Sequence, residues 1–170
     1  MSEFESFDLT DVDRITVGAV GEPGRRVFLL QARAGAELVT VKVEKQQVSA
    51  LAQYLADVLA DLPSVGDLPG ELELEEPAEP RFVVGVLGVT YDDATDRVVL
   101  VAQEAVAEES EEPDGGVLRV TATREQIAAL AIRGTALVEA GRPPCPLCGF
   151  PLDPSGHVCP RTNGHRAPTL

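Results

Sequence analysis

The sequence has few aromatic residues and no tryptophan: Phe, Tyr and Trp make up only 4% of its 170 residues. Hydrophobic residues still account for 44% of the chain, so we expect a core built from Val, Leu and Ala. No apolar run approaches the roughly 18 residues of a membrane span. The acidic N-terminal stretch also lacks the basic and apolar segments of a signal peptide. We therefore expect a cytoplasmic protein that does not enter a membrane.

Cysteine and histidine are absent from the first 144 residues, and all three cysteines and both histidines lie in the last 26. An odd number of cysteines argues against a disulfide framework. Without His or Cys, the first 144 residues lack the commonest general base and the commonest nucleophile. No phosphate-binding Walker motif, Gly-x-Gly-x-x-Gly or Gly-x-Ser-x-Gly is present. These absences argue against most catalytic classes.

The formal net charge of −14 is unevenly distributed. Residues 1–141 contain 11 of the 14 basic and 27 of the 28 acidic residues, a net charge of −16, whereas residues 142–170 have a net charge of +2. Such an acidic body repels nucleic acid and anionic lipid at a distance. Acidity of this kind also maintains solubility. Nucleic-acid binding is therefore conceivable only through the tail, where Arg142, Arg161 and Arg166 lie near the cysteines.

Three segments of the body occur twice in the same order. Residues 14–21 (RITVGAVG) match 81–88 (RFVVGVLG), 28–31 (FLLQ) match 100–103 (LVAQ), and 41–51 (VKVEKQQVSAL) match 120–130 (VTATREQIAAL). We interpret the match as a divergent internal duplication in which the second copy has longer loops. Gln47 corresponds to Gln126 in this alignment.

Each copy has the pattern of three strands followed by a helix. In the first copy, residues 15–20, 26–32 and 37–43 are short β-branched or apolar runs, and residues 44–62 have helical apolar spacing. In the second copy, Thr123 and Gln126 form a capping box, and Gly141 marks the end of the helix. The fold class we expect is α+β: a duplicated strand-strand-strand-helix body with a mainly antiparallel sheet.

The domain boundaries follow from this pattern. The body spans residues 1–141, with repeat one at about 14–62 and repeat two at about 81–141. Residues 63–80 form an acidic linker rich in Pro, Gly and Glu, with a short ordered piece expected at residues 72–74. Residues 142–170 form a separate tail, because the Arg-Pro-Pro stretch at 142–144 cannot continue a helix.

The tail has the spacing of a zinc site. Cys145 and Cys148 form a Cys-x-x-Cys knuckle, and His157-x-Cys159 follows after eight residues. Thiolate and imidazole are the ligands that zinc prefers, and four of them leave no open position, which is typical of a structural site. The sequence therefore predicts one structural Zn²⁺ per chain in a small zinc-ribbon-like module, whose folding the metal would drive.

The cysteines allow three other interpretations. A redox Cys-x-x-Cys needs a helix that starts at the first cysteine, and Gly149 and Pro151 would break it. A haem attachment needs a histidine directly after the second cysteine, where Gly149 stands. Surface thiols without metal remain an alternative. His165 is an alternative to His157 as the fourth ligand.

The chain resembles an uncharacterised actinobacterial family catalogued only as a domain of unknown function. The resemblance covers nearly the whole chain and is most specific in "FLLQAR", "VEKQQV" and "AGRPPCPLCGFPLDPSGHVCPRTNG". It implies a two-part protein, with a body and a terminal module at Cys145, Cys148, His157 and Cys159. It implies no catalytic residues.

We expect a noncatalytic interaction or adaptor protein that binds a protein partner, with the zinc module as a rigid projection. The first alternative is an enzyme with its site at the seam between the two repeats, where carboxylates and the polar residues 44–47 (EKQQ) are the candidates. Lys45 among them is more simply a solvated residue of the first helical turn. The second alternative is nucleic-acid binding through the basic tail.

Overall fold

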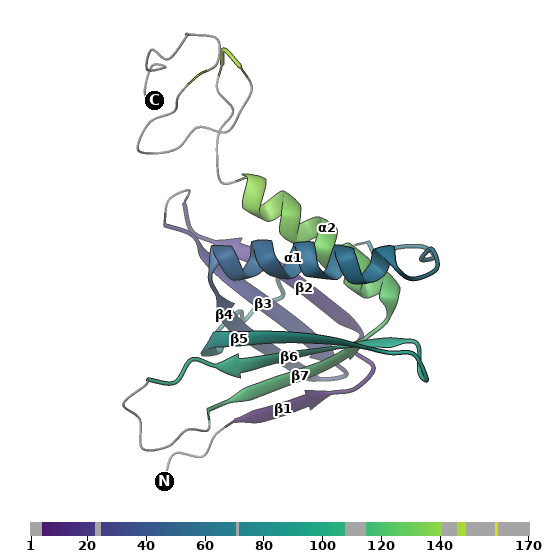
Figure 1. Ribbon diagram of the computed structural model, residues 1–170. Helices are drawn as coiled ribbons and strands as arrows, with labels where there is room; N and C mark the ends of the chain where they lie inside the picture. Colours follow the sequence, from purple (N-terminus) through teal and green to yellow (C-terminus); the bar gives the residue numbers. More distant parts are fainter. Residues whose placement is uncertain are drawn as a thin grey trace.

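The computed structural model describes residues 5–22, 25–70, 72–107, 115–140, 146–148 and 159. These residues form seven strands and two helices, and the helices lie together against a curved sheet (Figure 1). No helix in these ranges is long and apolar enough to cross a membrane. In chain order the elements are β1 (Ser6–Leu9), β2 (Arg14–Val20), β3 (Val27–Ala34), β4 (Glu37–Val43), α1 (Lys45–Ala60), β5 (Pro80–Asp92), β6 (Arg97–Glu104), β7 (Val117–Ala122) and α2 (Arg124–Ala140).

The sheet is strongly curled. Its strand order is β1-β7-β6-β5-β4-β3-β2, so β1 and β2 lie at opposite edges although only residues 10–13 separate them. In a flat sheet with strands about 4.8 Å apart the two edges would be roughly 29 Å apart. The connection can span at most about 18 Å. The curl is held by hydrogen bonds from the Val12 N–H to the Thr121 carbonyl (3.1 Å) and from the Asp13 N–H to the Arg33 carbonyl (2.9 Å).

The sheet is mixed, which corrects the expectation of a mainly antiparallel one. Strands within each repeat pair in antiparallel fashion, but β4 pairs with β5 and β1 pairs with β7 in parallel. The physical reason is connectivity, because α1 and the segment after it return the chain to the end at which β4 began. The second parallel pairing involves β1, a strand that the sequence pattern did not indicate.

Three strands and a helix follow one another twice after β1, as the sequence predicts. The strand ladders nevertheless shift the alignment of the two copies. The central ladder joins Val17, Leu30 and Val41 in the first copy and Val89, Leu100 and Val120 in the second. Val17 therefore corresponds to Val89 in space, whereas the sequence match had placed Val17 with Val84.

With this register, the single strand β5 is the counterpart of β1 and β2 together. Asp8 in β1 lies opposite Arg119 in β7, as Pro80 at the start of β5 lies opposite Thr40 in β4. The first copy bends between its two strands at Asp11, whose φ is +50°. The first repeat thus extends back to β1, beyond the expected start at residue 14.

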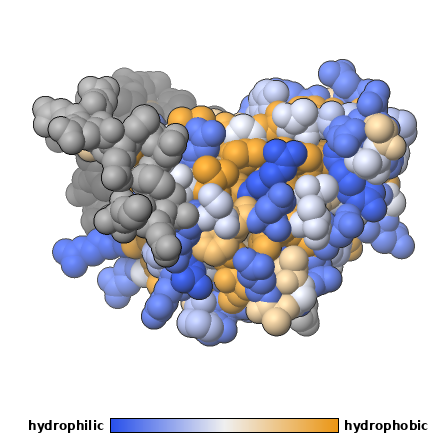
Figure 2. Space-filling model, turned by 90° about the horizontal axis from the view of Figure 1, so that it is seen from below, coloured by the Kyte–Doolittle hydropathy of each residue, from blue (hydrophilic) through white to orange (hydrophobic). Residues whose placement is uncertain are grey.

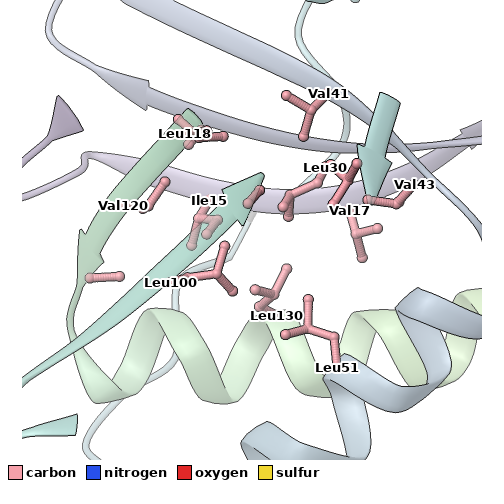
Figure 3. Close-up of a cluster of buried hydrophobic side chains, with 14 of the residues drawn as sticks. Ile15, Val17, Leu30, Val41, Val43, Leu51, Leu100, Leu118, Val120 and Leu130 are labelled. Atoms are coloured by element: carbon pink, nitrogen blue, oxygen red, sulfur yellow. The ribbon is translucent and has the colours of Figure 1, made fainter. Parts of the chain in front are cut away.

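One hydrophobic core lies between the sheet and the helices. Alternate strand side chains point into it and meet Leu51 from α1 and Leu130 from α2 (Figure 3). The core consists largely of Val, Leu, Ile and Ala, with Phe28 and Phe82 as its buried aromatic side chains in the described ranges. Burial of each Val or Leu contributes roughly 1.5–3 kcal/mol. The expectation of an aliphatic core is confirmed.

Part of the acidic linker is hydrogen-bonded to the sheet. Residues 72–75, hereafter the strap, cross the face of β2 and β3 that points away from the core. The Thr16 hydroxyl donates to the Leu72 carbonyl. The Gln31 amide donates to the Glu75 carbonyl (2.9 Å), and the Glu75 N–H donates back to the Gln31 Oε1 (2.7 Å). These bonds satisfy a buried amide that would otherwise be costly in the sheet.

Candidate metal ligands and a candidate interaction groove

The structure describes two of the four predicted zinc ligands. Cys148 lies at the end of the turn 146–148 and is half-buried, and Cys159 is fully buried. Cys145 and His157 lie outside the described residues, as does the alternative ligand His165. The predicted ligand set thus stays a prediction.

Two described cysteines are too few to form the centre by themselves. Within the described ranges, no group of three or more His, Cys, Asp or Glu side chains could hold a metal ion. The chemistry of the four-residue donor set, three thiols and one imidazole, fits Zn²⁺. The burial of Cys159 is compatible with a ligand, since structural zinc sites exclude water from their thiolates.

The polar residues at the seam between the repeats are used to start a helix. The Gln47 Oε1 accepts a hydrogen bond from the Glu44 N–H (2.8 Å), which completes a capping box at the first turn of α1. The Gln47 Nε2 donates to the carbonyls of Val84 (3.0 Å) and Gly85 (3.3 Å) in β5. This side chain joins α1 to β5, which is a structural role for one residue of the expected catalytic candidates 44–47.

Gln126 makes the same two kinds of bond in the second repeat. Its Oε1 accepts from the Thr123 N–H (2.9 Å), and its backbone N–H donates to the Thr123 hydroxyl (3.2 Å), as the predicted capping box requires. Its Nε2 donates to the Val12 carbonyl (2.7 Å), just before β2. Each helix is therefore attached at its first turn to the other repeat, α1 to β5 and α2 to the residue two positions before β2.

A charged cluster surrounds the start of α2. The Arg124 guanidinium donates to both carboxylate oxygens of Asp96 (2.7 and 3.3 Å) and to the Pro63 carbonyl (2.6 Å), and the Tyr91 hydroxyl donates to Asp96 (2.7 Å). The hydrogen bond from Arg124 lowers the pKa of Asp96, and the bond to Asp96 raises the pKa of Tyr91. The donors and acceptors satisfy one another, so the cluster joins three segments.

A second charged cluster holds the strap. The Arg33 Nε donates to the Glu75 carboxylate (3.0 Å), and Arg14 lies 3.7 Å from the same carboxylate and donates to the Glu73 carbonyl. Arg14, Arg33 and Arg133 line a polar hollow of about 710 Å³ together with the strap. The negative charge of the strap thus compensates the positive charge of arginines that cluster on an otherwise acidic body.

An open, mainly apolar groove lies between α1 and β5, beside the seam. This groove, of about 610 Å³, is lined by Gln47, Ala50, Leu51 and Tyr54 of α1 and by residues 85–89 of β5. Among the described residues, no charged side chain lines it. Tyr54 and Val86 are 52% and 60% exposed. On another face, the one seen from below, apolar residues also gather, interrupted by polar ones (Figure 2).

The groove exists because β5 has a partner on only one side over most of its length. Its ladder with β4 ends at Val83, and the ladder with β6 shifts register between Val84 and Val86. Sequence reasoning did not find the groove. The available signal was a pair of glycines, Gly85 and Gly88, in a β-branched run, a pattern that marks a bulge or a close approach.

Comparison with known proteins gives a family but no activity. Neither the curated proteins nor the solved structures contain a match to this chain. A family model covers residues 7–159, from β1 to the last cysteine. The chain therefore belongs to the family described as "Protein of unknown function (DUF3090)".

Proposed function

We propose that this chain is a noncatalytic interaction protein whose body binds a protein partner and whose tail is a structural zinc module. The observation that supports the role most strongly is the uncharged groove between α1 and β5. Large apolar side chains such as Tyr54 and Val86 are exposed there on a chain with a net charge of −14. Exposed apolar surface with a polar surround is typical of interaction sites.

In this proposal Cys145, Cys148, His157 and Cys159 hold one Zn²⁺ per chain. Bound zinc would supply the folding free energy of a segment that is too short to fold by apolar burial alone. The site would be structural, because four protein ligands leave no position for substrate. The proposal assigns no catalytic residue and no nucleic-acid partner.

The zinc part is tested by elemental analysis of protein purified without chelator. We expect about one zinc per chain, with mixed sulfur and nitrogen ligation in X-ray absorption. Cys145→Ser should abolish stoichiometric zinc and leave the helical circular dichroism nearly unchanged. The reason is that the hydrophobic cluster between the sheet and the helices, in the described residues, contains no cysteine, and the buried Cys159 belongs to the tail. His165→Ala should retain zinc and His157→Ala should lose it. Metal-free wild-type protein would refute this part.

The partner part is tested by affinity capture from the source cells with three baits. The wild-type chain should retain a stoichiometric partner, and Tyr54→Lys should lose it, because a charge would enter the apolar groove. Cys148→Ser tests whether the tail contributes to the same contact. As a matched control, Gln53→Lys, at an exposed position of the same helix, should leave capture unchanged. Equal capture by wild type and Tyr54→Lys would contradict the groove as the binding surface.

A further inference from the structure

Helix α1 lies against β5 as α2 lies against β2, so the two helix–strand pairs can be compared position by position. Gln47 bonds Val84 as Gln126 bonds Val12, and the strand ladders have the same register. The pair α1–β5 therefore matches the pair α2–β2. By this correspondence the helix residues Ala50, Leu51 and Tyr54 match Ala129, Leu130 and Arg133, and residues 85–89 of β5 match residues 13–17.

In the pair α2–β2 the space is closed. The Arg133 Nε donates to the Val17 carbonyl on the outer edge of β2 (2.7 Å). A Cβ added to Gly134 would lie 3.3 Å from Ala52 and 3.8 Å from Val17, so α2 packs tightly against both α1 and β2. Ala129 is only 4% exposed. The helix itself thus covers this strand edge and supplies a hydrogen-bond donor to it.

In the pair α1–β5 the corresponding space is open. Tyr54 replaces the arginine and is more than half exposed, and Ala50, the match of the buried Ala129, is exposed. Beyond Val83 the β4 side of β5 has no strand partner in the described part of the chain. Open strand edges present backbone N–H and C=O groups that readily accept a further strand.

The residues that line the groove indicate which kind of ligand it can bind. The described residues that line it are uncharged and are mainly Val, Leu, Ala and Gly, so a charged occupant would lose its hydration without compensation. One wall is a strand edge, which requires main-chain donors and acceptors at regular spacing. An extended polypeptide supplies both, with alternate side chains directed into the groove.

We propose that the groove between α1 and β5 binds an extended, uncharged, apolar segment of a partner protein, which adds to β5 as a further strand. This inference rests on the interaction role proposed above and gives the chemical class of the partner. The bound segment would do for β5 what α2 does for β2: cover the strand edge and supply hydrogen-bond donors to it.

The test uses the full chain, in its purified form, and a phage-displayed library of random nine-residue peptides as the probe. Selected peptides should be uncharged, with apolar residues at alternate positions. Their binding to protein labelled with 3-fluorotyrosine should shift the ¹⁹F resonance of Tyr54 and leave that of Tyr91, the only other tyrosine, in place. Methylation of alternate peptide nitrogens should weaken binding at least about tenfold, because an added strand depends on main-chain hydrogen bonds.

Two variants make the test specific to the edge. Tyr54→Arg imitates Arg133 and should reduce the affinity of the selected peptides at least about tenfold, measured by anisotropy of a labelled peptide. Tyr54→Phe keeps the apolar surface and should bind as the wild type does. Thermal melts establish that both variants are folded.

The inference is overturned if folded protein selects no peptide, selects charged peptides, or binds peptides that tolerate both N-methylation and Tyr54→Arg. Its failure can be told apart from failure of the interaction role. A partner captured from cells by wild type and by Tyr54→Arg alike would leave the role standing and refute only the groove.

Discussion

The pair α2–β2 and the pair α1–β5 begin with the same glutamine bonds and differ one to two turns further along the helix. Arg133 and Gly134 in α2 stand where α1 has Tyr54 and Leu55. Gly134 permits close approach, and the Arg133 guanidinium reaches the edge of β2. Leu55 is instead fully buried in the core, and Tyr54 extends to solvent.

This difference teaches that a repeated strand and helix pattern does not determine whether a helix covers its neighbouring strand. Whether a helix covers the strand edge depends on single residues at the contact. Such a residue must be small enough to let the helix pack closely or long enough to reach the strand edge. The same holds on the other face of the sheet. Thr16, Gln31 and Thr40 of the first repeat are buried, with Thr16 and Gln31 bonded to the strap, whereas the matching Gly88, Val101 and Arg119 are not buried.

The largest expected effect comes from truncating the matched leucines. Leu130→Ala should lower the free energy of unfolding by about 3 kcal/mol, since Leu130 is 2% exposed and its removal leaves a cavity. Leu51→Ala should cost roughly half as much, because Leu51 lines the open groove, where water can fill the space. Urea unfolding measures both. Equal losses would mean that the two helix–strand contacts are equally closed.

Removing the matched glutamines should have a smaller and nearly equal effect. Gln47→Ala and Gln126→Ala each lose a helix-capping acceptor and a donor to a strand carbonyl, so each should cost about 1–2 kcal/mol. Replacing either by Glu keeps the acceptor and loses the donor, which separates the two contributions. A cost at one site only would break the equivalence of the two helix starts.

The smallest effect is expected for the charged cluster at the start of α2, which has no counterpart at α1 in the described residues. Because Arg124 lowers the pKa of Asp96 in the folded chain, Asp96 stabilises the fold above its ordinary pKa of 3.8, and this contribution is lost as the pH falls through the folded value. Asp96→Asn should therefore lower the melting temperature slightly at neutral pH and have no such effect in strong acid. The asparagine tolerates the φ of +53° at this position.

Thermal melts across this pH range check the prediction, and salt should reduce the difference at neutral pH because the Asp96 side chain is exposed. Asp93→Asn, in the same turn, is the matched control and should not change the pH profile. A destabilisation by Asp96→Asn that is the same at every pH would contradict the ionic origin.

Much of the fold was predictable because its signals are local. Alternating valines in β4 and the capping pair Thr123 and Gln126 depend on neighbours within a few residues. The strand β1 was not predictable in this way, because it is short and is defined by its pairing with β7, more than 100 residues away. The sequence match superimposes the glycines of the two repeats, and this alignment is out of register with the sheet. In the sheet, the buried side chains of the two repeats correspond to one another.

The two candidate sites, the zinc ligands and the groove, also differ in whether a local sequence pattern predicts them. The zinc ligands are a local spacing of reactive residue types, so the sequence predicts them, and Cys145 and His157 lie outside the described residues. The groove arises from the absence of a partner for β5 beyond Val83, which no local pattern contains. Tyr54 has the spacing of an ordinary helix surface residue, and only the position of β5 gives it a role.

The most direct test of the open and closed pairs is the reactivity of a cysteine placed at the matched alanines. Ala50→Cys and Ala129→Cys are each made in a chain whose Cys145, Cys148 and Cys159 are replaced by Ser, and the rate of maleimide labelling is measured under native conditions. Ala50 is exposed and Ala129 is 4% exposed, so Cys at position 50 should react at least about tenfold faster than Cys at position 129. Equal rates in two folded variants would contradict the claim that α1–β5 is open where α2–β2 is closed.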